Sequence, residues 1–288
     1  MADVPEEVLR LARERDERRR ARDFAGADQL RDRIRELGYD IEDKPSGSEV
    51  IGTRGEPPRF DVSIHWIVEG WPQDVLRGIE AFRRHHPDER LQMVVIDTTR
   101  ADPAMWPHDA EASHCEPELG WAAARNAGLG RAAAPIVVVV DGSVEPVGDV
   151  LTPLREVLSE PAVGVAGPFG LVTKDLRDFQ ESEGPEVDAI EGYLMAFRRE
   201  VLIEAGLFDE GFRFYRAADL DLSFRIKDRG LQARVVALPV IRHEHRIWAT
   251  TPEGERERLS KRNFYRFLDR WRDRFDLCVA SKRNQTEP

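Results

Sequence analysis

Two aspartates two residues apart, Asp219 and Asp221, are the residues of this chain best placed for acid–base chemistry. They stand between an aromatic pair, Phe214-Tyr215, and a run of apolar and cationic residues that favours a helix. Side chains at i and i+2 of a helix point to different faces, so one carboxylate can face a pocket while the other anchors the backbone. A carboxylate at a helix N-terminus stays ionised at neutral pH, which suits a general base. A solvated acidic turn that opens a helix is the alternative, and this segment alone favours neither.

Three further acids each follow a predicted strand: Glu69, Asp97 and Asp141. Strands are predicted at 62–68, 91–96, 136–140 and 163–166, and helices at 71–85, 121–134 and 147–158. Continuous apolar strands that alternate with helices predict an α/β fold, with a mostly parallel central sheet flanked by helices. Ligands of such sheets bind at the carboxyl ends of the strands, where these acids stand. Simple strand-end caps are the alternative for Asp97 and Asp141, and for Asp141 a further reason is that Asp-Gly is also a turn dipeptide.

The order of motifs over about residues 60–248 resembles the family-2 glycosyltransferases, which have the A-type nucleotide-sugar fold, and above all their rhamnosyltransferase-like members. The matching segments are 97–102 (acidic loop that binds the nucleobase), 120–129 (helix under the nucleotide), 141–143 (metal motif), 191–194 and 206–210 (acceptor side), 218–222 (motif of the catalytic base) and 243–245 (late histidine). The resemblance implies an inverting transfer of a sugar from a nucleoside diphosphate sugar to a hydroxyl on a glycan or lipid-linked acceptor.

The resemblance also implies roles for individual residues. Asp219 is the expected base, and Glu191 and Gly192 are the expected acceptor wall. The expected donor-binding residues are Glu69, Asp97, Arg125, Asn126 and Asp141. A divalent metal, Mn or Mg, is expected on Asp141 with His243 or His245, since residues i and i+2 of a strand share a face. There are alternatives to these roles. Arg125 could be a surface residue, Asn126 a polar residue packed within its helix, and the histidine segment an ordinary edge strand.

Three positions depart from the family pattern. Ser143 stands at the position of the main metal-ligating acid, Ala218 replaces the leading glutamate of the base motif, and Glu69-Gly70-Trp71 replaces the usual first-strand turn. Three outcomes therefore stay open: metal use through Asp141, Glu145 or a histidine, metal-free transfer with arginines that offset charge, or a catalytically silent nucleotide- or glycan-binding module.

Composition limits the classes of partner. The chain has 288 residues, 41% of them hydrophobic, and a net charge of −11, which disfavours nonspecific binding of nucleic acids or anionic membranes by the whole surface. No apolar run approaches the ~18 residues of a membrane span, and the first residues do not resemble a signal peptide. Cys115 and Cys278 are interpreted as free thiols, so we expect a cytoplasmic protein, with a peripheral position at the inner face of a membrane as a variant.

The N-terminal part differs from the rest. Residues 1–44 are predicted to form a helical hairpin, 45–59 a linker, 60–250 the glycosyltransferase-like domain and 251–288 a C-terminal amphipathic helix and tail. Residues 19–43 resemble the C-terminal helical tail of cysteinyl-tRNA synthetases, which contacts tRNA. Docking on a second copy or a protein partner is favoured over an RNA-associated role, because acids nearly balance the arginines of the hairpin.

The predicted C-terminal helix, 255–275, mixes arginines and lysine with aromatic residues. Packing of this helix on the catalytic domain is favoured over contact with a membrane surface that carries a lipid-linked acceptor.

Overall fold

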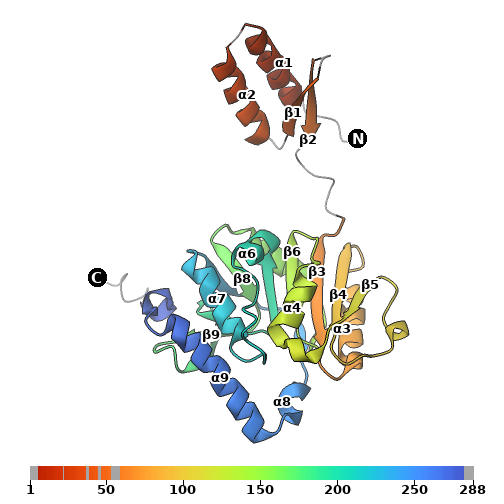
Figure 1. Cartoon of the computed structure of the whole chain (residues 1–288), viewed down its shortest axis with the longest axis vertical. Coiled ribbons are helices and arrows are strands. Elements are labelled where there is room, and N and C mark those ends of the chain that lie inside the picture. Colours follow the sequence, from red (N-terminus) through yellow and green to blue (C-terminus); the bar gives the residue numbers. More distant parts are fainter. Residues whose placement is uncertain (1–5, 22, 37–38, 45–46, 53–58, 282–288) are drawn as a thin grey trace. The chain divides into compact units, whose positions relative to one another are not determined.

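A computed structural model describes residues 6–21, 23–36, 39–44, 47–52 and 59–281 of the chain. The chain divides into two compact units, Met1–Arg59 and Phe60–Pro288, and each is described by itself (Figure 1).

The N-terminal unit contains a β-hairpin as well as the predicted pair of helices. Its elements are α1 (Glu6–Arg20), α2 (Phe24–Glu36), β1 (Tyr39–Lys44) and β2 (Gly47–Gly52). The strands pair antiparallel with Ile41 opposite Val50, and Ile41 joins Val8, Leu11 and Ile34 in a small core. Strand β2 therefore lies inside the segment that the sequence predicted as linker. The sequence Pro45-Ser46-Gly47 is typical of linkers and of hairpin turns alike. Only the apolar pair of Ile41 and Val50 distinguishes a hairpin from a linker.

The larger unit is built on an eight-stranded mixed sheet. In spatial order its strands are β11 (Glu186–Val187), β14 (Gln232–Val235), β8 (Val163–Gly167), β13 (Leu194–Arg198), β6 (Ile136–Val140), β3 (Val62–Val68), β4 (Leu91–Asp97) and β5 (Ala110–His114). Strands β6, β3, β4 and β5 are parallel, β14 is parallel to β8, and β13 and β11 run antiparallel to their neighbours. The predicted fold class, an α/β fold with a mostly parallel sheet flanked by helices, is confirmed.

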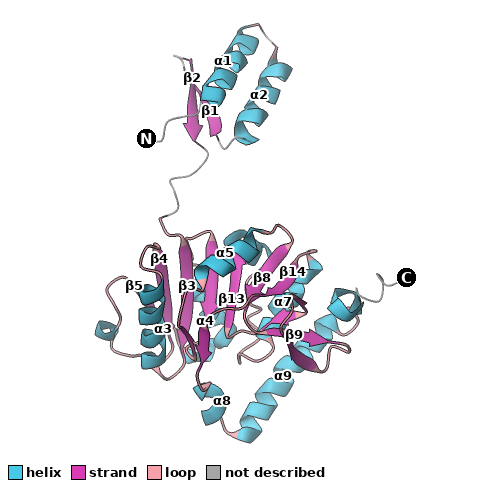
Figure 2. Ribbon diagram, turned by 180° about the vertical axis from the view of Figure 1, so that it is seen from behind, coloured by secondary structure: helices cyan, strands magenta, loops and turns pink. Residues whose placement is uncertain are grey.

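Helices cover both faces of this sheet (Figures 1 and 2). One face carries α3 (Pro72–His85) and α5 (Leu151–Ser159), and the other carries α4 (Trp121–Leu129), α7 (Ala218–Asp228) and α9 (Glu253–Trp271). Strand residues alternate between the two cores: Val138 joins the α3–α5 side and Val139 the α4–α7 side. Helix α4 approaches β3 very closely, because a Cβ at Gly128 would lie 1.8 Å from Nε2 of His65.

Short elements complete the unit. They are β7 (Val144–Pro146) paired with β15 (Val240–Arg242), a small sheet of β10 (Phe179–Ser182), β9 (Gly170–Thr173) and β12 (Ala189–Ile190), helices α6 (Arg199–Glu204) and α8 (Arg246–Thr250), and the 3-10 turns η1 (Pro103–Met105), η2 (Pro117–Leu119) and η3 (Phe275–Leu277). The predicted C-terminal helix is present as α9, and its buried Phe267 and Trp271 pack on the domain as the sequence favoured. No helix in the described ranges has the length and apolar character that a membrane crossing needs.

Candidate active site

The carboxyl ends of β3 and β6 bring Glu69 and Asp141 to one small cavity, which His245 also lines. Parallel neighbouring strands end at the same edge of a sheet, so acids that directly follow them meet there. His245 lies between β15 and α8. Strand β15 pairs with β7, which follows β6 closely in the chain, and this pairing brings His245 to the same edge.

Asp141 and His245 form a partly buried pair, with 17% and 11% of their side chains exposed and Oδ2 of Asp141 3.3 Å from Nε2 of His245. The other oxygen, Oδ1, accepts the backbone N–H of Ser143 at 2.8 Å and also its hydroxyl. Burial would raise the pKa of Asp141, but the hydrogen bond and charge of His245 and the bonds from Ser143 hold it below its ordinary value. Burial lowers the pKa of His245, but the hydrogen bond and charge of Asp141 outweigh burial, and the net effect is a raised pKa.

Two tyrosine rings enclose the imidazole of His245. Tyr193 and Tyr215 meet it edge-on, with ring centroids 5.5 Å and 4.6 Å away. The backbone N–H of Asp141 donates to the carbonyl of Tyr193 at 2.9 Å, so the strand end of β6 and the residue before β13 are tied together beside the histidine. The imidazole therefore has a fixed orientation toward Asp141.

Glu69 is a carboxyl whose proton affinity is set by its surroundings. Burial, and then the charge of Asp141, raise its pKa to about 7, against opposing contributions from Arg125 and His245. It lines both the small cavity and a neighbouring cavity of about 330 Å³. Glu69 therefore connects the Asp141–His245 pair to the larger space beside it.

Arg125 is a buried cation beneath this edge of the sheet, with 1% of its surface exposed. Its Nη1 donates to the carbonyl of His65 at 3.1 Å and contacts Nδ1 of the same residue at 3.0 Å, while the guanidinium lies over the ring of Trp121 at 5.1 Å. Burial lowers its pKa to about 10, and the charges of Asp141 and Glu69 oppose that change. Arg125 is thus charged at neutral pH and faces inward, not outward as a surface residue.

The 330 Å³ cavity lies over the ends of β3 and β4. Its lining residues are Ile67, Glu69, Gly70, Thr98, Thr99, Pro117, Gly120, Trp121, Ala124, Arg213, Phe214 and Ile247. Asp97 is not among them: its carboxylate accepts the backbone N–H groups of Thr99 and Ala101, each at 2.7 Å, and the Thr99 hydroxyl. Asp97 shapes the loop, and the two threonines face the cavity.

Asn126 also binds protein groups and not the cavity. Its amide donates to the carbonyl of Phe208 at 2.8 Å and accepts the Phe208 N–H at 3.0 Å, and it contacts Glu210 at 3.3 Å. This two-point contact fixes α4 to the segment before α7, which matches the packed-polar alternative for this residue.

Asp219 lies in the first turn of α7 and lines a cavity of about 600 Å³. Its Oδ2 accepts the N–H of Gly192 at 2.8 Å and its Oδ1 accepts the N–H of Leu220 at 2.9 Å. Burial raises its pKa despite these bonds and despite the charge of Arg216. The carboxylate is therefore held in one orientation and binds a proton more readily than a solvated aspartate.

Glu191 lines the same cavity as Asp219. Burial, and then the charge of Asp219, raise its pKa to about 7, while Arg242 opposes the change. Its Oε2 is buried without a hydrogen bond, and Nη1 of Arg242 lies 3.7 Å away. Two carboxyl groups with raised proton affinity thus face one space, and Gly192 holds the first of them.

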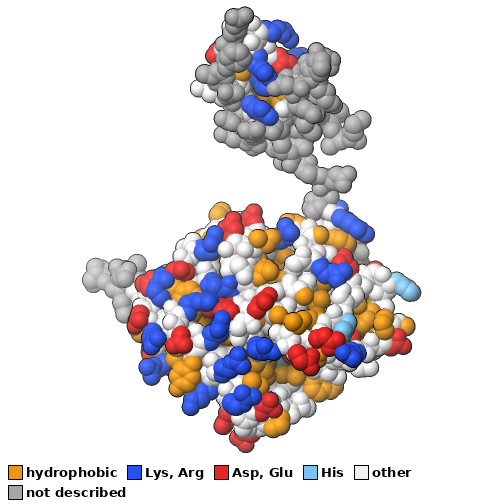
Figure 3. Space-filling view, in the orientation of Figure 1, with side chains coloured by type: hydrophobic (Ala, Val, Ile, Leu, Met, Phe, Trp, Pro, Cys, Tyr) orange, Lys and Arg blue, Asp and Glu red, His pale blue; other side chains and the backbone are white. Residues whose placement is uncertain are grey.

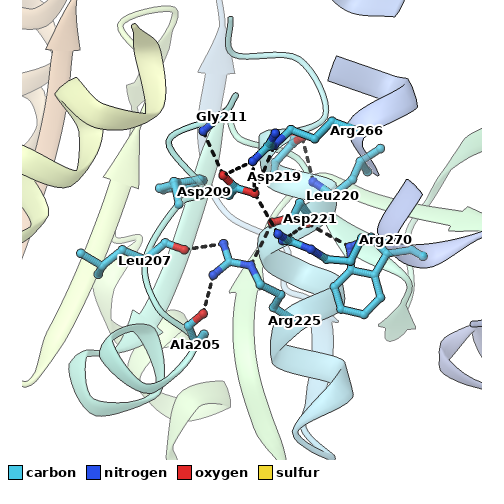
Figure 4. Close-up of polar contacts among 12 residues, drawn as sticks. Ala205, Leu207, Asp209, Gly211, Asp219, Leu220, Asp221, Arg225, Arg266 and Arg270 are labelled. Carbon is cyan, nitrogen blue, oxygen red and sulfur yellow. Dashed lines mark hydrogen bonds and ion pairs between the residues drawn. The ribbon is translucent and has the colours of Figure 1, made fainter. Parts of the chain in front are cut away.

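Asp221, the second aspartate of the motif, has a structural role. It is 1% exposed, and it accepts Nε of Arg225 at 2.9 Å, Nη1 of Arg270 at 2.8 Å and the indole N–H of Trp271 at 2.9 Å. Figure 4 shows Arg270 reaching from α9 to this carboxylate and to Asp209. The i, i+2 spacing divides the two roles as expected, one carboxylate toward a cavity and the other into the protein.

The donor set for a metal is small. His243 and His245 do not share a strand face, because β15 ends at Arg242, and His243 lies beside Glu145, 2.8 Å away. In the described ranges no group of three His, Cys, Asp or Glu side chains is arranged to hold a metal ion. Of the expected ligands, Asp141 and His245 lie together, and a cation held by these two would need phosphate oxygens and water to complete its shell.

Sequence reasoning missed several residues that build the site. Tyr193 and Tyr215 enclose His245, and Asn263 of α9, 2% exposed, donates to the carbonyls of Phe214 and Arg216 at 2.6 and 2.8 Å. The only local signal for Asn263 is a polar residue on the apolar side of an amphipathic helix.

No known protein-family profile matches this chain. A segment of 48 residues, 17% of the chain, is 48% identical to the cysteine–tRNA ligase of Methanosarcina acetivorans, and 47 residues are 40% identical to that of Caldicellulosiruptor saccharolyticus. Each match spans 10% of the ligase.

Among solved structures, GalNAc-T7 with UDP, GalNAc and Mn2+ is similar over 80% of this chain, with a TM-score of 0.60 and 16% identity. The mannosyltransferase PcManGT from Pyrobaculum calidifontis, in complex with GDP-Man and Mn2+, covers 64% of the chain with a TM-score of 0.48 and 22% identity. This chain spans 52% and 57% of those two chains. The similarity to GalNAc-T7 establishes an A-type glycosyltransferase-like fold.

Proposed function

We propose that this chain is an inverting glycosyltransferase that uses a nucleoside diphosphate sugar as donor and a hydroxyl as acceptor. The observation that carries the proposal is the arrangement of two acidic centres around one tyrosine. Tyr215 lines the cavity of Asp219 and contacts the ring of His245, the partner of Asp141. A base and a charged leaving-group site on either side of a shared wall are what an in-line displacement at a sugar requires.

In the proposed step, Asp219 accepts the proton of the acceptor hydroxyl while the oxygen of that hydroxyl bonds to the anomeric carbon of the donor. The bond from that carbon to the diphosphate breaks, and its electron pair leaves with the diphosphate. Because Asp219 is oriented by two backbone N–H groups, little reorganisation is needed when the proton moves.

The departing diphosphate requires positive charge. Arg216, whose charge acts on Asp219 and His245, and the buried Arg125 supply fixed cations near the proposed donor side. A divalent cation, when bound, would offset the same charge, and Asp141 and His245 are the residues that would hold it. The nucleoside is proposed to occupy the 330 Å³ cavity, with Glu69 at the boundary between nucleoside and diphosphate.

A thermal-shift screen of nucleotide sugars, each with and without Mn2+, tests this proposal, since a ligand that binds the native state raises the melting temperature. Stabilisation by a nucleotide sugar, followed by sugar transfer with inverted configuration, is the expected result. Nucleotide binding without transfer would favour a silent binding module, which the Ser143 and Ala218 substitutions make the main rival. No stabilisation by any nucleotide sugar would refute the donor site.

A second proposal concerns the N-terminal unit, because the chain shares a 48-residue segment with cysteine–tRNA ligases. We infer that this unit docks the enzyme on a protein partner, a second copy or an RNA. A gel shift of the full chain with total tRNA that survives moderate salt would identify RNA, and sedimentation of the chain alone would identify self-association. For the glycosyltransferase itself, we also propose a cytoplasmic location and a glycan or lipid-linked acceptor.

A further inference from the structure

One wall of the 600 Å³ cavity carries hydrogen-bond donors that have no acceptor. Arg177, in the turn before β10, and Ser260 and Lys261, on α9, line this wall. The Ser260 hydroxyl is buried and unbonded. Across the residues that the structure describes, the Arg177 guanidinium has no hydrogen-bond or ion-pair partner, and Lys261 contacts only the Tyr265 ring, 5.9 Å away. Donors from two separate elements therefore converge on one space.

The surface around α9 is rich in cations. Figure 3 shows Lys and Arg side chains gathered over the face that α9 forms. Some arginines of α9 have carboxylate partners, since Arg266 and Arg270 bind Asp209 and Arg258 lies 3.8 Å from Glu255. In a chain with a net charge of −11, carboxylates are plentiful. The cations at the cavity are thus left available to a ligand.

The same cavity is also lined by carboxylates. Glu181, Glu191 and Asp219 are among its lining residues, together with Arg216. The remaining lining acid is Asp178, whose Oδ2 accepts the side-chain amide of Gln180 at 3.2 Å. The cavity therefore brings the proposed base, Asp219, and donors without acceptors into one space.

We propose that this cavity takes an anionic acceptor, whose reacting hydroxyl lies at Asp219 and whose phosphate or carboxylate group lies among Arg177, Ser260 and Lys261. A guanidinium matches either anion with two parallel hydrogen bonds, and charge-assisted bonds are about twice as strong as neutral ones. Apolar lining residues, such as Phe264 and Leu171, suit the body of a sugar ring. The inference names the acceptor class for the proposed function and rests on it.

The test compares three sugars that differ in charge at one position: glucose, glucuronic acid and glucose 6-phosphate. Binding to the full chain is measured by ligand-observed NMR at low ionic strength. We expect at least one charged sugar to bind roughly tenfold more tightly than glucose. Which of the two gains more distinguishes a phosphate from a carboxylate as the recognised group.

The matched variants use side chains that are exposed, so that the fold is retained. The double variant R177Q/K261Q should reduce the preference to within about twofold while glucose binding stays unchanged. Arg262→Gln removes the adjacent exposed cation of α9, which does not line the cavity, and should preserve the preference. Equal binding of all three sugars, no binding of any, or a preference that survives in R177Q/K261Q would overturn the inference. The nucleotide-sugar screen is independent of these sites, so its failure would refute the transferase and leave the anion preference standing.

Discussion

Substitution of Asn263 by Asp tests whether α9 holds the loop that leads to the proposed base. The Asn263 amide donates to two carbonyls, those of Phe214 and Arg216, and the loop continues through Ala217, which has a left-handed backbone (φ 64°), to Asp219. Aspartate has nearly the same shape but offers a carboxylate in place of the NH2 group. The variant therefore removes the donor and leaves the packing volume unchanged.

The magnitude follows from the two lost bonds. Each hydrogen bond contributes about 1 kcal/mol net, and a buried carbonyl left without a donor costs about 1–3 kcal/mol. Because the side chain is 2% exposed, water cannot replace the donor, and we expect a loss of about 2–4 kcal/mol in the free energy of unfolding. With a slope of about 2 kcal/mol per molar urea, the unfolding midpoint falls by about 1–2 M.

Tryptophan fluorescence reports this transition cleanly, because all six tryptophans lie beyond residue 59, in the larger unit. Arg262→Gln, at the preceding exposed position of α9, is the control and should shift the midpoint by less than about 0.3 M. If Asn263→Asp unfolds at the same urea concentration as the control, the amide does not secure the loop, and our account of how Asp219 is positioned is wrong.

Asp219→Asn should lower the transfer rate about 10³-fold while the donor dissociation constant changes less than about twofold; steady-state kinetics with the identified donor measures both, and equal rates would remove Asp219 from the mechanism. Glu191→Gln should gain stability relative to the wild type as pH rises from 5 to 8. The pKa of Glu191 is raised in the folded state from its ordinary value of 4.5 to about 7, so between these values the folded protein binds more protons than the unfolded chain and the wild type loses stability as pH rises. Urea titrations at several pH values measure the difference, and a gap that is constant with pH contradicts the shift. Gly128→Ala should cost about 3 kcal/mol, since its Cβ would overlap His65, whereas Gly254→Ala, with no atom within 4 Å, should be neutral or slightly stabilising; equal effects would contradict the close approach of α4 and β3.

The sequence predicted the framework of the site well, because strand periodicity and strand-end acids are local signals. Glu69 and Asp141 meet at one edge of the sheet since their strands are parallel neighbours of a common layer, which the apolar runs already indicate. The separation of roles between Asp219 and Asp221 likewise follows from helical spacing.

Side chains whose partners lie far along the chain were not predictable in this way. Asn126 stands in the expected helix, but its partner is the backbone of Phe208, 82 residues away. Asp97 follows its strand as expected, yet its oxygens are taken by the loop that it begins. Residue type and position in an element are local properties, whereas the direction in which an amide or carboxylate finds its partner is decided by tertiary packing.

The contact between Asp221 and the end of α9 makes two distant stretches of the gene interdependent. Arg225, Arg270 and Trp271 all donate to this one carboxylate, so its replacement leaves the buried indole N–H of Trp271 without an acceptor and removes an ion-pair partner from both arginines. Truncation of the chain before residue 270 would remove Arg270 and Trp271, and Asp221 would lose these two donors. We therefore expect substitutions of Asp221 and of its three donors to be tolerated in evolution only when they change together.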